Sequence, residues 1–173
     1  MTTALRADAE RNRGLVLEAA RAVFAEQGAD ACVADIAERA GVGVGTLFRR
    51  FPHKDDLVAA LIAERMQEIA ALARSARSFR EFMAGTVRLH MGDRCLCDVV
   101  DRAVLERPEL DAARREVRTL VRRLLRDAQA AGEVRKSVTV DDVPVIVLGV
   151  ARSAPPDRWR RYLDFALDGL RPR

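Results

Sequence analysis

The side chains best suited to chemistry in this sequence are basic residues gathered in one short stretch. Arg39, Arg49, Arg50 and Lys54 lie in a stretch without acidic side chains, although the whole chain carries a net charge of only +4. Lysine and arginine bind phosphate oxygens, and arginine also pairs with the O6 and N7 atoms of guanine. The stretch therefore predicts a surface that can face the backbone of a nucleic acid.

A second group of reactive side chains lies further along the chain. His90, Asp93, Cys95 and Cys97 are close in sequence, and imidazole and thiolate are ligands that zinc prefers. Two cysteines separated by one residue on a helix point about 200° apart, however, and zinc motifs usually leave two or more residues between them. We therefore expect this group to pack in the protein without binding a metal. A metal site and a thiol sensor are the alternatives.

Catalysis finds little support in the sequence. The chain has only two histidines, His53 and His90, and no pattern that pairs a nucleophile with a base or cradles a phosphate. We therefore expect neither enzymatic activity nor a cofactor.

Helices are the elements that would position the basic stretch. Apolar residues recur at helical spacing over about residues 11–28. A second helix is expected over 33–40, closed by Gly41, and a third over 44–51, ended by Pro52. Two short helices joined by a glycine turn form a helix-turn-helix unit, which places its second helix in the DNA major groove. A plain helical hairpin is the alternative.

The rest of the chain also shows helical periodicity, and we expect an all-α protein of about nine helices. Further helices are predicted from Lys54 to about Arg74, over Phe79 to Met91, over Cys95 to Leu105, over Glu109 to Ala131, over Val143 to Ala151 and from Trp159 onward. Six arginines line the helix over Glu109 to Ala131. They predict a solvated face, with a second nucleic-acid surface as the alternative.

The region from Val143 to Ala151 is apolar on nearly every side, and a helix of that kind must be covered on every side. We expect a second copy of the chain to provide the cover, so a homodimer is predicted. The expected interface residues on the last two helices are Val147, Val150, Trp159, Leu163, Ala166, Leu167 and Leu170.

The segment from Asp35 to Leu57, DIAERAGVGVGTLFRRFPHKDDL, is similar throughout to the DNA-binding signature of the TetR (tetracycline-repressor) family. Leu15 to Gly28 resembles the first helix of that family, and Glu133 to Arg171 resembles the C-terminal regulatory part of one of its branches. The resemblance implies a helix-turn-helix DNA-binding domain over residues 1–53 and a helical-bundle domain for ligand binding and dimerisation over residues 54–173.

The resemblance also implies which residues touch DNA. Thr46 and Phe48 would contact phosphates or bases, and Lys54 would touch a phosphate where backbone N–H groups at a helix start add to the attraction. Leu47 and Phe51 are expected to pack in the core, and core packing is the alternative for Phe48. The full expected DNA-binding set is Val44, Gly45, Thr46, Phe48, Arg49, Arg50, His53 and Lys54.

Two positions depart from the family pattern. Gly43 stands where many members have a serine cap, and Cys32 stands where the second helix often begins with serine or threonine. Neither residue offers the side-chain oxygen that caps a helix well. Phosphate contacts at these two positions are therefore in doubt.

The family resemblance further implies a ligand cavity between about residues 80 and 131. The candidate lining residues are Phe79, Phe82, Met83, His90 and Met91, with simple core packing as the alternative for each.

The predicted function is that of a homodimeric, sequence-specific transcriptional regulator, a ligand-released repressor. It would bind a near-palindromic double-stranded DNA operator with half-sites about 34–36 Å apart. An unknown small-molecule effector is the second expected partner. The alternatives are a helical sensor or partner-binding dimer without operator binding, and a non-specific nucleoid-type binder. The polar first ten residues and the absence of a long apolar run predict a cytoplasmic protein without membrane contact.

Overall fold

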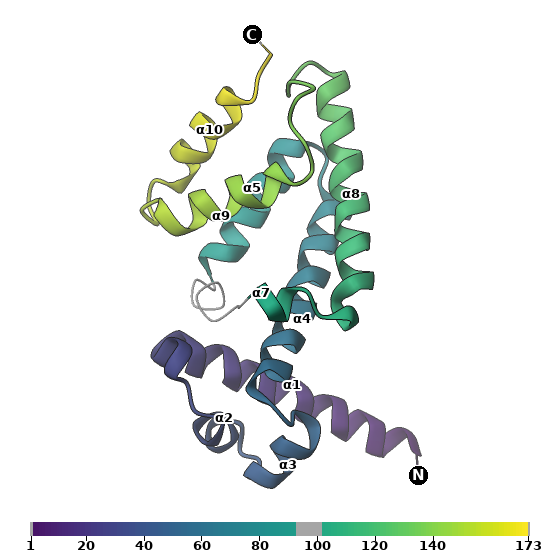
Figure 1. Cartoon of the computed structure of the whole chain (residues 1–173), viewed down its shortest axis with the longest axis vertical. Helices are drawn as coiled ribbons and strands as arrows, with labels where there is room; N and C mark the ends of the chain where they lie inside the picture. Colours follow the sequence, from purple (N-terminus) through teal and green to yellow (C-terminus); the bar gives the residue numbers. More distant parts are fainter. Residues whose placement is uncertain (1, 93–101, 173) are drawn as a thin grey trace. The chain divides into compact units, whose positions relative to one another are not determined.

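The computed structural model of the chain describes residues 2–92 and 102–172, which form helices joined by turns (Figure 1). No strand occurs within these two ranges, and the predicted all-α class is confirmed. The chain divides into two compact units. Among the described residues, unit 1 holds 2–64 and 102–110, and unit 2 holds 65–92 and 111–172.

Unit 1 is built around its first helix. Helix α1 spans Thr2–Gln27, so it begins at Thr2 rather than near residue 11. It packs against α2, and α2 packs against α3. The elements of this unit are α1, η1 (Gly28–Asp30), α2 (Val33–Ala40), α3 (Val44–Arg50), the first half of α4 (Lys54–Ser75), α7 (Arg102–Leu105) and η2 (Pro108–Leu110).

The division of the chain differs from the predicted boundary between residues 53 and 54. Helix α4 continues through residue 64 without a break, so the change from one unit to the other falls inside a helix. Residues 102–110 return to unit 1 after the chain has entered unit 2. A boundary inside a continuous helix leaves no linker composition that a sequence could display.

The turn between α2 and α3 depends on Gly41. Its φ of 67° lies in the left-handed region that glycine adopts without a steric penalty. The Gly41 N–H donates to the carbonyl of Glu38, and the Val42 N–H donates to the carbonyl of Ala37, both at 3.0 Å. These two bonds form a Schellman motif, which satisfies carbonyls at the end of α2 and directs the chain into α3.

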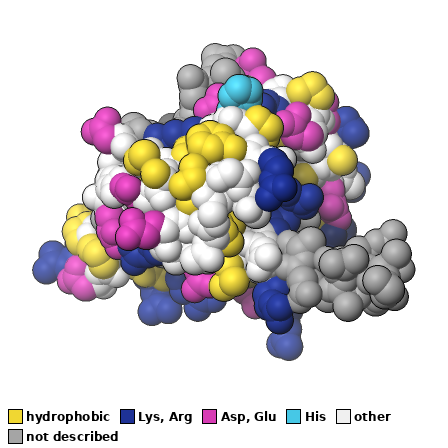
Figure 2. Space-filling model, turned by 90° about the horizontal axis from the view of Figure 1, so that it is seen from below, with side chains coloured by type: hydrophobic (Ala, Val, Ile, Leu, Met, Phe, Trp, Pro, Cys, Tyr) yellow, Lys and Arg dark blue, Asp and Glu magenta, His cyan; other side chains and the backbone are white. Residues whose placement is uncertain are grey.

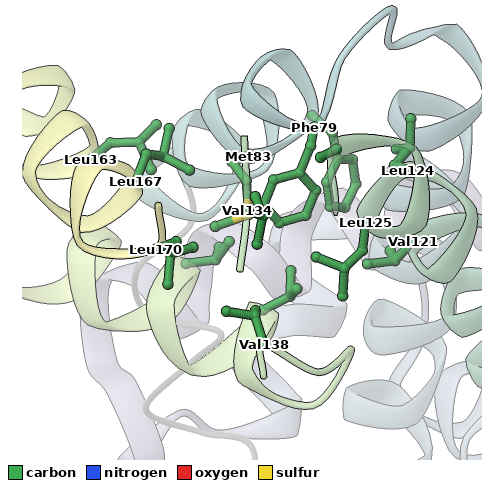
Figure 3. Packing of buried hydrophobic residues seen from close by; sticks show 14 of the residues in the cluster. Phe79, Met83, Val121, Leu124, Leu125, Val134, Val138, Leu163, Leu167 and Leu170 are labelled. Carbon is green, nitrogen blue, oxygen red and sulfur yellow. The ribbon is translucent and has the colours of Figure 1, made fainter. Parts of the chain in front are cut away.

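Unit 2 packs α5 (Phe79–Met91) against α8 (Asp111–Ala130), α9 (Asp142–Ser153) and α10 (Trp159–Gly169). Buried apolar side chains from these helices form one cluster, in which Phe79 and Met83 of α5 meet Leu163 and Leu167 of α10 (Figure 3). Because every element of unit 2 contributes to the cluster, burial of this apolar surface stabilises their arrangement.

Local hydrogen bonds set the starts of two helices in unit 2. The Ser78 hydroxyl accepts from the N–H of Glu81 at 3.1 Å and caps α5. The Asp142 carboxylate accepts from the N–H of Thr139 at 2.7 Å, and this bond is the first of the causes that lower the pKa of Asp142. These are the capping interactions that serine, threonine and aspartate favour at such positions.

Helix α9 is not covered on every side within its own chain. It buries Val143, Val147 and Ala151, which lie four residues apart on one face, and leaves Val145 70% exposed.

Within the ranges that the structure describes, no helix combines the length and hydrophobicity that crossing a membrane requires.

Candidate nucleic-acid interface

Helix α3 is held to unit 1 by two apolar residues and presents the rest of its side chains to solvent. Leu47 and Phe51 are buried, as predicted from their four-residue spacing. Val44, Thr46, Arg49 and Arg50 are exposed. Phe48 is 45% exposed and does not belong to the core, so its ring is accessible to a partner.

The face on which α2 and α3 lie is mixed in character rather than uniformly basic. Figure 2 shows hydrophobic side chains near the centre of this face, with separate Lys and Arg side chains around them. Arg39 is not an isolated positive charge, because its Nη1 lies 2.6 Å from Oε1 of Glu26 on α1. The basic stretch of the sequence therefore does not form one continuous patch.

Two polar side chains on α3 contact each other. Arg49 donates through Nη2 to the Thr46 hydroxyl oxygen at 3.1 Å. Both residues are exposed and one helical turn apart, so the bond holds the arginine along the helix rather than free in solvent. A guanidinium carries five N–H donors, so the exposed Arg49 side chain keeps donors that could pair with a guanine edge or a phosphate.

Arg50 lies on the side of α3 that faces α1. A groove of about 200 Å³ separates the two helices, and its lining residues are Asn12, Arg13, Val16, Val42, Thr46, Leu47, Arg50 and Phe51. The Arg13 guanidinium also lies 3.3 Å from Glu64, which lies 3.0 Å from Arg21. These ion pairs join α1 to α4 within unit 1.

Lys54, at the first position of α4, makes an intramolecular contact. Its Nζ lies 5.6 Å from the centre of the Phe24 ring, a distance at which a cation is attracted to an aromatic face. Lys54 is half-buried, so part of the side chain still reaches solvent. The predicted phosphate contact of Lys54 requires its ammonium group to be in that exposed part.

The start of α4 is fixed by an acidic residue that the sequence analysis did not select. The Asp56 carboxylate accepts a hydrogen bond from the backbone N–H of His53 at 2.8 Å. It also forms an ion pair with the guanidinium of Arg107, with Nη2 and Oδ1 2.8 Å apart. Burial alone would raise the pKa of Asp56, but these two contacts outweigh it and the pKa is lowered. Arg107 also donates to the carbonyl of Asp55.

The weak cap Cys32 is compensated by a neighbouring amide. Cys32 makes no side-chain capping bond. Instead, the side chain of Gln27 accepts from the Cys32 N–H at 3.4 Å and donates to the Asp35 carboxylate at 2.8 Å. The start of α2 therefore has partners, although the residue at the cap position supplies none. Gly43 likewise makes no side-chain cap at the start of α3.

The predicted interface residues on α9 and α10 divide into two sets. Val147 and the leucines Leu163, Leu167 and Leu170 are buried in the cluster of their own chain, and Figure 3 shows the three leucines. Val150, Trp159 and Ala166 are half-buried. The exposed apolar side chains of the same helices were not selected from the sequence. They are Val145 on α9 and, on α10, Tyr162 and Phe165, which are 44% and 57% exposed.

The candidate ligand residues separate only in part, because Phe82 belongs both to the core cluster and to a pocket wall. Phe82 and His90 line a pocket of about 140 Å³ in unit 2. Phe79 and Met83 are buried in the core cluster (Figure 3). Met91 packs against this cluster. The sequence could not distinguish the two groups, because pocket walls and core share the same apolar residue types.

Two other candidates have different outcomes. Asp93, Cys95 and Cys97 lie outside the described residues, and within those residues no group of three metal-ligating side chains was found. On α8, Arg114 and Arg118 pair with Asp111 and Asp141. The arginine face of α8 is therefore partly neutralised, which favours the solvated interpretation.

Comparison with known families gives two matches that together span most of the chain. The model described as bacterial regulatory proteins, tetR family, matches residues 16–61. The model described as transcriptional regulator SbtR-like, C-terminal domain, matches residues 74–172. A comparison with curated protein sequences gave no match.

Solved structures extend these matches over nearly the whole length. A TetR transcription regulatory protein from Mycobacterium vanbaalenii is 34% identical with a TM-score of 0.65, covering 97% of this chain and 99% of its own. A TetR transcriptional regulator from Streptomyces coelicolor is 31% identical with a TM-score of 0.62, covering 92% and 98%. FadR from Bacillus subtilis, in complex with stearoyl-CoA, shares the fold at 19% identity, with a TM-score of 0.66 and coverage of 90% and 97%. The family models and these relatives together show that the chain belongs to the TetR family of bacterial transcriptional regulators.

Proposed function

We propose that this regulator is a homodimeric repressor that binds a near-palindromic operator through α3 and is released from it by a small molecule. The observation that carries the proposal is the arrangement of α3, where Leu47 and Phe51 are buried while Thr46, Phe48 and Arg49 are exposed. A short helix anchored on one face and polar on the other is suited to enter a major groove. Unit 1 would bind DNA, and unit 2 would bind the effector and the second subunit.

Within this scheme each exposed residue of the interface has a distinct role. Arg49 would read a base or hold a phosphate, with Thr46 keeping its guanidinium along the helix. Phe48 would make apolar contact with a thymine methyl group or a sugar, while Val44 and Gly45 allow close approach at the leading end of α3. Arg50, His53 and Lys54 would contact the phosphate backbone on either side.

The dimer would use the outer faces of α9 and α10. Exposed apolar residues on these helices are Val145, Tyr162 and Phe165, and the rings of Tyr162 and Phe165 lie edge to face with centres 6.3 Å apart. Aromatic residues that remain exposed on a folded chain are enriched at interfaces between subunits. The leucines predicted from the sequence, Leu163, Leu167 and Leu170, are buried in their own chain. We therefore assign the interface to the exposed residues, which a second subunit can contact.

Ligand release requires an effector with different affinities for the DNA-bound and free conformations. The pocket in unit 2 is the proposed effector site, because it is an apolar hollow with a few polar groups, the usual character of small-molecule sites. Among the neighbours in fold, FadR was crystallised with stearoyl-CoA and KstR2 of Mycobacterium tuberculosis is named a ketosteroid regulator. A regulator of transcription would act in the cytoplasm.

A second candidate function is a helical sensor dimer that has lost operator binding. Two observations support this alternative. Cys32 and Gly43 provide no side-chain cap to α2 and α3, and the basic surface is interrupted. A non-specific DNA-binding protein is disfavoured by the same interrupted surface, because non-specific binding depends on many phosphate contacts.

The test is a selection of genomic fragments by the purified protein. The proposal predicts recovery of fragments that share an inverted repeat with half-site centres about one helical turn apart. It also predicts two chains per repeat by analytical ultracentrifugation. Recovery of no common sequence would support the sensor dimer or the non-specific binder instead.

A further inference from the structure

The pocket in unit 2 has features that restrict the effector that it could hold. It lies among α4, α5, α8 and α9, and its volume is about 140 Å³. The buried residues of its lining are Phe82, Thr86, Val121, Val143 and Val147. The half-buried residues Ile69, His90, Val117 and Val140 surround them, and Arg118 and Pro144 are exposed.

The volume sets the size of the occupant. An apolar cavity of about 150 Å³ in another protein holds benzene, whereas sites for drug-sized ligands occupy about 300–1,000 Å³. The pocket of about 140 Å³ therefore accommodates roughly one six-membered ring. A long acyl chain or a steroid nucleus exceeds this volume.

The polar groups of the pocket set the charge of the occupant. Arg118 is the only lysine or arginine among the lining residues that the structure describes, and its guanidinium is paired with Asp141, so this pair adds no net charge to the exposed edge. His90 is the other lining side chain that can carry a charge. The side-chain hydrogen bond to Asp141 is the first of the causes that raise the pKa of Arg118. An anionic ligand would have to compete with Asp141, and an ionised group would lose its hydration against the valines.

Thr86 defines one hydrogen-bonding position at the buried end. Its hydroxyl donates to the carbonyl of Phe82 at 2.8 Å within α5, so the hydroxyl hydrogen is already used. The hydroxyl oxygen can still accept a second hydrogen bond. A ligand with one O–H or N–H donor would therefore match this position better than a ligand that only accepts.

Resting on the proposed function, we propose that the effector is a compact, uncharged molecule of about one ring, apolar except for one O–H or N–H donor directed at Thr86. Two larger hollows in the described part of unit 2 do not share these features. One is lined in part by Glu81, Arg88 and Arg160, and the other by Arg80, Glu133 and Arg171. Such charged surfaces are better suited to solvent than to an apolar ring.

The experiment measures thermal unfolding and calorimetric binding of the full chain without DNA, using phenol, toluene, benzoate and palmitate as probes. A ligand that binds only the folded state raises the melting temperature. We expect phenol and toluene to stabilise the protein, phenol more strongly, and benzoate and palmitate to have no effect. Thr86→Val, a change of nearly equal shape, should weaken phenol binding about tenfold and leave toluene binding unchanged.

Two variants that fill the pocket serve as controls for solvent effects. Val147→Phe fills the buried end, and Val117→Phe fills the half-buried side should the first variant fail to fold. Loss of the phenol response in a folded variant supports the site. An equal response in a filled variant, no response to either ring in the wild type, or stronger binding of benzoate or palmitate would overturn the inference. Because DNA is absent, its failure is separate from any failure of operator binding.

Discussion

Arg107 donates a hydrogen bond to the carboxylate of Asp56 at 2.8 Å, although 51 residues separate the two in the sequence. Asp56 also accepts from the backbone N–H of His53, so a residue on the segment between α7 and η2 holds the turn that precedes α4. This turn carries His53 and leads directly into Lys54 at the start of α4, and both are proposed phosphate contacts. The proposed DNA-binding surface therefore has a supporting residue, Arg107, far outside the helix-turn-helix signature.

Arg107→Ala is expected to weaken operator binding severalfold, because the turn that carries His53 and leads into Lys54 would lose a support. A double-mutant cycle with Asp56→Asn should give a coupling of about 0.5–1 kcal/mol in unfolding free energy, as for a partly exposed pair. Arg80→Ala, which breaks the pair with Asp164 in unit 2, is the matched control and should leave operator affinity unchanged. Additive effects of the two substitutions in unit 1 would show that the pair is not coupled.

The same pair predicts a pH dependence. The pKa of Asp56 is lowered in the folded protein, so its contribution to stability is complete above the ordinary pKa and is lost as the pH falls through the lowered value. The difference in unfolding free energy between wild type and Arg107→Ala should therefore be constant near neutral pH and shrink below about pH 4. Urea unfolding across this range checks the direction.

Arg49→Ala and Lys54→Ala should each weaken operator binding about tenfold at physiological salt while leaving a folded dimer. Arg49 would lose a base or phosphate contact, and Lys54 would lose a phosphate contact, which should also reduce the salt slope by about 1. Arg126→Ala on the exposed face of α8 removes the same charge and should have no effect on binding. Dissociation of either variant into monomers, or its unfolding, would assign the residue a structural role.

Two glycines in the helix-turn-helix unit should respond in opposite ways to the same substitution. Gly41→Ala forces a side chain into the left-handed region and should destabilise the protein by about 1 kcal/mol. Gly45 lies inside α3 with open space around it, so Gly45→Ala should stabilise the helix by about 0.5–1 kcal/mol. We nevertheless expect Gly45→Ala to bind the operator less tightly, since its methyl group would project at the DNA. Urea unfolding and operator titration separate the two effects.

The dimer hypothesis predicts different outcomes for two neighbours on α10. Phe165→Asp should give a folded monomer, because Phe165 is 57% exposed and its ring lies beside Tyr162 and Arg161 of the same helix. Leu167→Asp should unfold unit 2, because Leu167 is 6% exposed and points into the core cluster (Figure 3). Sedimentation and circular dichroism test both. A dimeric Phe165→Asp protein would place the interface elsewhere.

Local signals explain what could be predicted from the sequence. Helix α2 has the bounds expected from its apolar spacing and from Gly41, and α3 ends where Pro52 requires. These features depend on neighbouring residues in the chain. The exposure of α3 followed as well, because Leu47 and Phe51 define a single buried face.

Features that depend on distant residues could not be predicted. The ion pair of Arg107 with Asp56 joins segments whose approach no local pattern reveals. The last two helices carry apolar residues on more than one face, so periodicity alone could not separate Leu167, which is buried, from Phe165, which is exposed. The compensation of Cys32 by Gln27 likewise requires the turn between α1 and α2 to be formed.

The central claim, that this regulator reads a specific DNA sequence through α3, is tested most directly by operator affinity across a salt series. A selected operator and a scrambled duplex of equal length are titrated in parallel. The account predicts a steep decrease of affinity with salt and a preference for the operator of about a thousandfold or more. Equal affinity for the two duplexes, or binding that does not change with salt, would contradict it.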